Sequence, residues 1–218
     1  MNARANLLRQ LGGRIAAVEG RTAVAIDGVD GSGKTTFADE LAPILAGEGR
    51  TVTRASIDAF HNPRSIRYRR GKSDPEGFFL DSYNYADLRH FLLDPFRAGA
   101  DVVDVARYDH AADVSVSRPT TVDPSAILLI DGIFLHRDEL RCFWDFSIFL
   151  SVPFPVSYER MACRDGSPSD PLAPQNRRYY EGQRIYLRRC QPDKRATVVI
   201  DNSVIDAPVV LTGTADAT

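Results

Sequence analysis

The hydrophobic positions along the chain fall into two kinds of segment. Short runs rich in Val, Ile, Leu and Ala have the composition of strands buried on both faces. These strands are expected at 22–27, 51–58, 126–131, 146–152 and 196–201. Longer segments carry apolar residues at helical spacing, and these helices are expected at 34–46, 85–97, 155–164 and 175–189. The alternation indicates an α/β fold, in which a five-stranded parallel sheet is covered by helices on both faces.

Two internal segments depart from this alternation. Between 101 and 122, valines alternate with polar residues around Tyr108, which predicts a β-hairpin flap outside the main sheet. The segment at about 165–178 begins with an irregular stretch rich in Pro, Ser and Asp. Irregular segments of this length in a compact domain are often lids over binding sites, so we expect a lid here.

The two ends of the chain are predicted to differ from the domain between them. Residues 1–20 place leucines and an isoleucine on one helical face among arginines, which is typical of an amphipathic helix and not of a signal peptide. One domain is expected over 21–205. Residues 206–218 are expected to form a C-terminal tail whose small, polar end is frayed.

Residues 28–35 read Gly-Val-Asp-Gly-Ser-Gly-Lys-Thr, a complete G-x-x-x-x-G-K-[ST] phosphate loop. The loop lies between an expected strand and an expected helix, as the motif requires. Its glycines let backbone N–H groups point at a phosphate chain, Lys34 reaches the β- and γ-phosphates, and the Thr35 hydroxyl takes a Mg²⁺ position. The motif predicts a P-loop NTPase fold that binds a nucleotide together with Mg²⁺. The expected nucleotide-binding residues of the loop are Gly28, Asp30, Gly31, Ser32, Gly33, Lys34, Thr35 and Thr36.

Two aspartates end expected strands near this loop. In open parallel sheets, ligands bind beyond the carboxyl ends of the strands. Asp131 is therefore expected at the substrate, where it would hold Mg²⁺ together with Thr35; the alternative is a plain Asp-Gly turn. Asp58 is expected to accept the proton of a substrate hydroxyl; the alternative is a helix N-cap or turn residue.

Arginines bracket the expected lid. Arg160 and Arg164 lie four residues apart before it, and Arg177 and Arg178 follow it. Such a loop is typical of a lid that closes on phosphates and screens charge in the transition state. We expect Arg160 at the nucleotide, and Arg164 at the substrate as a catalytic group beside Lys34. The alternative is a solvated helix face whose arginines pair with neighbouring acids.

Aromatic residues and a basic run suggest where the acceptor binds. Phe78, Tyr83, Tyr108 and His110 are candidate substrate-binding residues, because aromatic rings stack on a flat base; core packing is the alternative for some of them. The run at 64–72 holds most of its charge in arginines. It is an RNA-binding patch, a solvated loop or part of a substrate mouth, and the last two are commoner for a single short cluster.

Composition narrows the class of partner. The net charge of −2 gives no global field that favours nucleic acid or an acidic membrane. Three widely spaced cysteines without a C-x-x-C pair indicate free thiols in a reducing cytoplasm. No apolar stretch approaches the ~20 residues needed to span a bilayer. We therefore expect a cytoplasmic protein that acts on a small, nucleoside-like molecule, without a nucleic-acid or membrane partner, and a homo-oligomer stays open.

Several of these motifs occur together, in order, in one known family. They are the phosphate loop, Ser56–Phe60, Asp81–Asn84, Val103–Asp109, Ile130–Phe134 and Arg160–Asp165. With them the chain resembles, over most of its length, the uridine kinase and phosphoribulokinase-like group of P-loop small-molecule kinases.

The resemblance implies transfer of the ATP γ-phosphate to a sugar hydroxyl, the ribose 5′-OH of uridine or cytidine. It implies Asp58 as the base, Tyr108 at the nucleobase and Arg164 at a phosphate or the ribose. The chain departs from the family where the acceptor is recognised. The family's histidine after Tyr-Asp is here either His110 or replaced by Asp113, and Gly-Phe-Phe at 77–79 stands where the family has a ribose-binding aspartate. Pantothenate, a sugar or a nucleoside monophosphate as acceptor, and a non-catalytic nucleotide-binding switch, remain alternatives.

Overall fold

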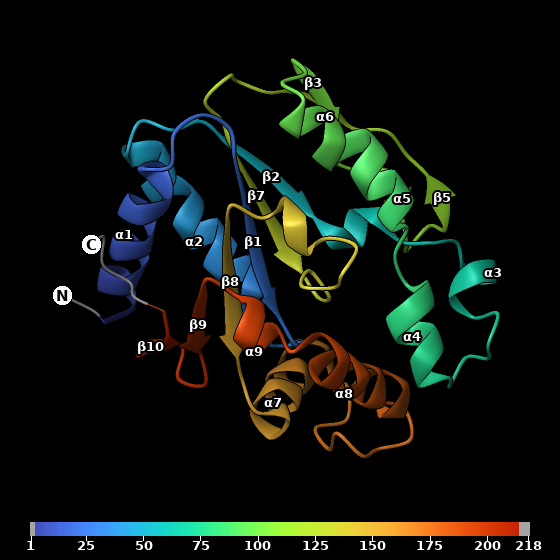
Figure 1. Cartoon of the computed structure of the whole chain (residues 1–218). Coiled ribbons are helices and arrows are strands. Elements are labelled where there is room, and N and C mark those ends of the chain that lie inside the picture. Colours follow the sequence, from blue (N-terminus) through green and yellow to red (C-terminus); the bar gives the residue numbers. More distant parts are fainter. Residues whose placement is uncertain (1–2, 214–218) are drawn as a thin grey trace.

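The computed structural model describes residues 3–213 and has a six-stranded sheet at its centre (Figure 1). The strand order is β10-β9-β8-β1-β7-β2, with five parallel strands and β10 antiparallel to β9. The strands are β1 (Thr22–Gly28), β2 (Val52–Ser56), β7 (Ile127–Gly132), β8 (Phe146–Ser151), β9 (Val198–Asp201) and β10 (Val209–Thr212). The five parallel strands are those that the sequence predicts, so the α/β class is confirmed.

Alternate residues of the central strands face two separate cores. Ile26 of β1 packs with Leu11 of α1 and Leu41 of α2 on one face. Ala25, its neighbour, faces the other core, where Tyr186 of α8 lies. Helices therefore cover both faces, with α1 and α2 on one side and α5 and α6 on the other (Figure 1). The longer helices are α1 (Ala3–Ala16), α2 (Lys34–Gly47), α7 (Phe154–Asp165) and α8 (Arg177–Cys190).

The short helices connect the strands. They are η1 (Ile57–Phe60), α3 (Arg64–Arg67), α4 (Pro75–Asp81), α5 (Tyr85–Leu88), η2 (Arg89–Leu93), α6 (Asp94–Arg97), η3 (Arg141–Phe143) and α9 (Pro192–Arg195). Within residues 3–213, no helix combines the length and the apolar character needed to cross a bilayer.

The flap expected between 101 and 122 is present as two short antiparallel ladders. β3 (Val102–Asp104) pairs with β6 (Pro119–Thr121), and β4 (Tyr108–Asp109) pairs with β5 (Val114–Ser115). Neither ladder joins the main sheet. The irregular segment expected as a lid connects α7 to α8.

Two segments contain more regular structure than the sequence predicts. The prolines and glycines of residues 59–80 predict a loop, but this segment includes α3 and α4. α4 forms because the Asp74 side chain accepts a hydrogen bond from the Gly77 N–H and Pro75 occupies the first turn. The expected C-terminal tail includes β10, a run of Val, Val, Leu and Thr that adds an edge strand to β9. The expectation of a frayed end falls largely on residues 214–218, which lie outside the described residues.

Candidate active site

The phosphate loop lies where β1 ends and α2 begins, as the motif predicts. Gly31 and Gly33 have φ angles of 72° and 90°, a region that glycine adopts without strain. A Cβ on Gly31 would also collide with the Ser157 carbonyl oxygen of α7. These two glycines let the loop bend tightly at the positive end of α2, where an anion binds. In this arrangement the Lys34 ammonium donates to the Val29 carbonyl at 2.8 Å.

A buried network anchors the start of the loop. The Asp27 carboxylate is fully buried and accepts hydrogen bonds from the Gly28 N–H at 2.7 Å and from His136, whose Nδ1 lies 2.7 Å away. The Tyr186 hydroxyl of α8 donates to the same carboxylate. Burial and the Asp27 charge raise the pKa of Tyr186 well above its usual range, so this hydroxyl stays a donor. The network ties the end of β1 to α8 directly beneath the phosphate loop.

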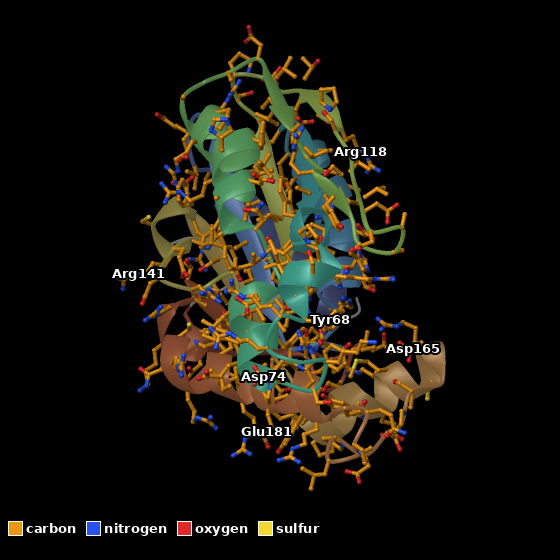
Figure 2. The ribbon with its side chains drawn as sticks, turned by 90° about the vertical axis from the view of Figure 1, so that its right-hand side faces the viewer. Tyr68, Asp74, Arg118, Arg141, Asp165 and Glu181 are labelled. Atoms are coloured by element: carbon orange, nitrogen blue, oxygen red, sulfur yellow. The ribbon has the colours of Figure 1, made fainter. Side chains whose placement is uncertain are left out.

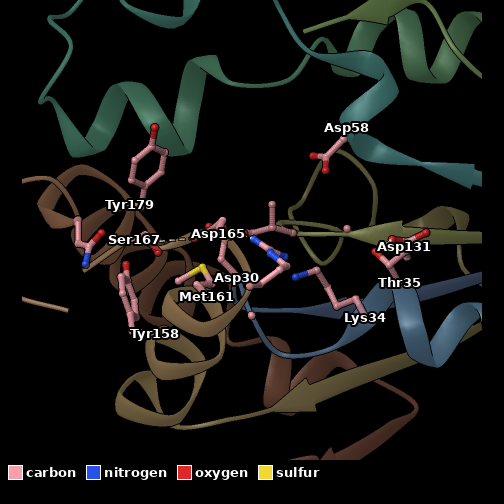
Figure 3. Close-up of a pocket in the computed structure, with 15 residues that line it drawn as sticks. Asp30, Lys34, Thr35, Asp58, Asp131, Tyr158, Met161, Asp165, Ser167 and Tyr179 are labelled. Atoms are coloured by element: carbon pink, nitrogen blue, oxygen red, sulfur yellow. Dashed lines mark hydrogen bonds and ion pairs between the residues drawn. The ribbon is translucent and has the colours of Figure 1, made fainter. Parts of the chain in front are cut away.

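The two residues predicted to hold Mg²⁺ lie next to each other, where α2 begins beside the end of β7. The Thr35 hydroxyl donates to the Asp131 carboxylate at 2.8 Å, so the two predicted metal ligands are adjacent (Figure 3). Asp131 is 3% exposed, and its other oxygen accepts from Arg54 at 3.0 Å. A hydroxyl and one carboxylate are oxygen ligands of the kind that Mg²⁺ uses when substrate phosphates and water complete its shell. The residues present therefore fit Mg²⁺.

Asp58 lies across a cavity of about 340 Å³ from the phosphate loop (Figure 3). It sits in η1, immediately after β2, and Lys34, Thr35 and Asp131 line the same cavity. The Tyr83 hydroxyl donates to its carboxylate at 3.0 Å. Burial, followed by the nearby Asp58 charge, raises the pKa of Tyr83 well above its usual range, which keeps the donor protonated.

A second carboxyl group lies in the same cavity. The Asp30 backbone N–H donates to the Gln183 side chain at 2.8 Å, which fixes the turn that carries the carboxyl. Burial raises the pKa of Asp30, Lys34 opposes that shift, and the Asp58 charge adds to it. Asp30 and Asp58 thus share the space beside Lys34, and Asp131, Arg164 and Asp165 line the same cavity.

The two lid arginines have different environments. Arg164, at the end of α7, lines the cavity and pairs with Asp165 at 2.9 Å. Arg160 instead donates to the carbonyls of Asn202 and Ser203, each at 2.8 Å, and makes a longer hydrogen bond of 3.5 Å to the Gly31 carbonyl. It does not line the cavity. The structure therefore brings Arg164, but not Arg160, to the predicted centre of transfer. Thr36 is exposed on α2, outside the cavity lining, whereas Ser32 is buried and its hydroxyl has no hydrogen-bond partner within residues 3–213.

Three of the four aromatic residues predicted to bind the acceptor line one pocket, and the fourth does not. Phe78, Tyr83 and His110 line a pocket of about 240 Å³ that also contains Asp58 and Asp30. Tyr108 does not line this pocket. Its hydroxyl donates to Asp113 at 2.8 Å, because the tight β4–β5 turn brings that carboxylate back onto the ring. Of the two positions weighed for the family's histidine, His110 lines the pocket, whereas Asp113 is a partner of Tyr108.

Sequence reasoning did not select three residues of this region. His61 stacks on His110, with ring centroids 4.6 Å apart, and its Nδ1–H donates to the Asp58 carbonyl oxygen at 2.8 Å. Arg67 lines the acceptor pocket, and Arg54 pairs with Asp131. A polar residue within a half-buried strand was a signal for Arg54, and the basic run at 64–72 was a signal for Arg67.

Three features are brought together here: the phosphate loop, the adjacent Thr35 and Asp131 that fit Mg²⁺, and Asp58 on the other side of the cavity. This combination is that of a P-loop kinase. The model of the phosphoribulokinase/uridine kinase family matches residues 23–168. The chain belongs to this family.

Individual relatives differ in the acceptor that their names give. A uridine kinase from Deinococcus deserti is 25% identical over 196 residues, which are 86% of this chain and 90% of that protein. A pantothenate kinase from Limosilactobacillus reuteri is 36% identical over 115 residues, but these are 50% of this chain and only 36% of that protein. A structure described as a possible uridine kinase from Bacillus stearothermophilus superposes with a TM-score of 0.72 at 28% identity, over 89% of this chain and 97% of that one.

Proposed function

We propose that this protein transfers the γ-phosphate of ATP to a hydroxyl of a small metabolite. The observation that carries the proposal is the position of Asp58, which lines one cavity with Lys34 and Thr35 and a second pocket with the acceptor candidates. A hydroxyl held between the two would meet a base on one side and the phosphate on the other. A nucleotide-binding switch without turnover would not need such a carboxylate.

Each residue has a distinct role in this proposal. Asp58, oriented by the Tyr83 hydroxyl, accepts the proton of the attacking hydroxyl. Lys34 and Arg164 hold the phosphate oxygens and balance the charge that develops there. Thr35 and Asp131 would hold Mg²⁺, which when bound supplies charge neutralisation at the phosphates. Closure of the segment between α7 and α8 would exclude water, so that the hydroxyl is phosphorylated in preference to water.

Two classes of acceptor fit this chemistry. The names of the relatives favour the ribose 5′-OH of a pyrimidine nucleoside, and the aromatic rings of Phe78 and His110 would suit a flat base. That acceptor would give the protein a role in nucleoside salvage in the cytoplasm. The second class is a hydroxylated metabolite with an anionic group, and the charge of the acceptor pocket favours it, as argued below.

The experiment that tests the proposal is a panel of acceptors with labelled ATP. The purified chain is incubated with MgATP labelled at the γ-phosphate and with nucleosides, sugars, hydroxy acids, pantothenate and nucleoside monophosphates. The proposal expects stoichiometric transfer of label to at least one acceptor, together with ADP. Release of inorganic phosphate alone, or no turnover with any acceptor, would contradict it.

A further inference from the structure

A cationic cavity adjoins the acceptor pocket. Its volume is about 890 Å³, and its ionisable lining consists of Arg64, Arg67, Lys72, His110, Arg178 and two tyrosines. No Asp or Glu is among its lining residues, although the whole chain has a net charge of −2. The cavity shares Arg67, His110 and Arg178 with the acceptor pocket, so the two spaces are continuous. Figure 2 shows Tyr68, which forms part of one wall, next to the layer of α7 and α8, and the Arg178 guanidinium of α8 lies over its ring.

Arg67 is the central cation of this space. The residue is 9% exposed, and its Nε has no hydrogen-bond partner within residues 3–213. Its nearest carboxylate, Asp113, lies 3.4 Å from Nη2 and is itself engaged by the Tyr108 hydroxyl. The other acceptor of Nη2 is the His110 carbonyl, at 3.5 Å. A buried guanidinium with two long contacts, one of them to a shared carboxylate, is poorly compensated. An anion in the adjoining pocket would supply the missing partner.

Arg178 of α8 explains why Arg67 is held in place. Its guanidinium donates to the backbone carbonyls of Arg67, Gly71 and Asp74, and within the described residues it makes no ion pair with a carboxylate. Burial lowers the pKa of Arg178, as expected for a cation compensated only by dipoles. The contacts fix the 67–74 segment to α8 and add a second positive charge beside Arg67.

The other arginines of the same run show that this charge is not a general property of a solvated loop. Arg69 and Arg70 both pair with the buried Asp81, at 2.5 Å and 3.0 Å, and Arg70 also lies 4.0 Å from Glu76, so carboxylates compensate this part of the run. Arg64 and Arg67 turn instead to the cavity. The run therefore contains two arginines that pair closely with Asp81, Arg69 and Arg70, and two that line the cavity, Arg64 and Arg67.

We propose that the acceptor carries an anionic group, a carboxylate or a phosphate, in addition to the hydroxyl that is phosphorylated. The inference rests on the proposed kinase function. The hydroxyl lies at Asp58, and the anionic group binds Arg67, with Arg64 and Lys72 at the rim. A neutral nucleoside would leave Arg67 with only its long ionic contact to the shared Asp113 carboxylate, so the geometry favours a hydroxy acid or a sugar phosphate.

Anion binding is measured first, independently of turnover. The chain is saturated with MgADP, so that the phosphate loop is filled, and is titrated by calorimetry with inorganic phosphate and separately with glycerate. We expect one anion per chain, bound more weakly as salt is added, and an affinity at least about tenfold lower in Arg67→Gln. The matched control is Arg188→Gln, an exposed arginine on α8. No binding by the wild-type chain, or equal binding by Arg67→Gln, would overturn the inference.

Because Arg67 is buried, its variant could fail to fold, and a second variant guards against that outcome. The double variant Arg64→Gln/Lys72→Gln alters two exposed residues of the rim. It should lower the affinity for the same anion without changing the melting temperature. Unchanged affinity in this double variant, with an unfolded Arg67→Gln, would also count against the site.

Turnover then separates the inference from the proposed function. Glycerol, glycerate and glycerol phosphate form a matched set, and uridine represents the neutral nucleosides. We expect a higher kcat/KM for an anionic acceptor than for its neutral counterpart, and loss of that difference in Arg64→Gln/Lys72→Gln. If uridine is the best acceptor and the variant treats it as the wild type does, the inference is wrong while the kinase stands. If no acceptor is phosphorylated, the kinase assignment fails, and the calorimetric result still decides the anion site.

Discussion

Removal of the Tyr186 hydroxyl tests whether the buried network beneath the phosphate loop contributes to stability. Tyr186→Phe keeps the ring, which is 1% exposed, and deletes a hydroxyl that donates to Asp27 and accepts from the His136 N–H at 3.1 Å. That N–H keeps the Asp27 carboxylate as an acceptor at 3.2 Å, so the donor to Asp27 is the main loss. A hydrogen bond to a charged group contributes about 1.5–3 kcal/mol. Asp27 keeps its hydrogen bonds from Gly28 and His136, so its charge stays compensated in the variant. We therefore expect the free energy of unfolding to fall by about 2 kcal/mol.

The loss converts to a melting temperature. For a chain of this size, each kcal/mol moves the midpoint by about 2–4 °C, so Tyr186→Phe should melt roughly 4–8 °C below the wild type. The measurement is calorimetric unfolding at neutral pH, with and without MgADP. Because Gly28 is tied to the same carboxylate, MgADP should also bind several-fold more weakly, about 1 kcal/mol or less.

Tyr85→Phe is the matched control. The Tyr85 hydroxyl is buried and makes no hydrogen bond within the described residues, so its removal should leave the melting temperature unchanged or raise it. If Tyr186→Phe and Tyr85→Phe melt at the same temperature, the reasoning about the Asp27 network is refuted.

Three further predictions concern the site itself. Asp131→Asn should weaken Mn²⁺ binding to the ADP complex by more than about tenfold, measured by electron paramagnetic resonance; an unchanged affinity would remove Asp131 from the metal site. Arg164→Gln should lower kcat by about 100-fold, whereas Arg160→Gln should leave kcat unchanged and lower stability; steady-state kinetics showing the reverse order would exchange their roles. Burial lowers the pKa of His61, so below about pH 6.5 the unfolded chain binds more protons than the folded chain, and the stability falls as the pH drops. His61→Gln should flatten this pH dependence in thermal melts between about pH 5 and 7.5. If the melting temperature of His61→Gln falls with pH as steeply as that of the wild type, His61 is not the source.

The donor side of the site could be predicted from the sequence because its determinants are local. The phosphate loop requires particular glycines, one lysine and one threonine within eight residues, and the flanking strand and helix are evident from hydrophobic spacing. Asp58 and Asp131 were found because parallel strands bring their carboxyl ends to one edge of the sheet. Both inferences depend on backbone topology and not on side-chain packing.

The acceptor side could not be predicted in the same way, because it depends on side chains that meet across the fold. Tyr108 turns to Asp113 instead of the pocket, and nothing in the spacing distinguishes these two outcomes. Arg67 lines the cavity, unlike Arg69 and Arg70, and its backbone carbonyl accepts a hydrogen bond from Arg178, which lies more than a hundred residues later in the sequence. Residue spacing within the run does not predict that contact. The helix α4 was foreseeable from Asp74-Pro75, whose capping signal outweighs the loop-like composition around it.

The most direct test of the central claim is the rate of phosphoryl transfer in Asp58→Asn, measured in a single turnover with the best acceptor of the panel. Asp206→Asn, an exposed aspartate in the turn before β10, is the control. General-base catalysis contributes about 10²–10⁴-fold, so we expect a decrease of at least about 100-fold in Asp58→Asn with unchanged MgADP affinity and melting temperature. Transfer at the wild-type rate in Asp58→Asn would contradict the account.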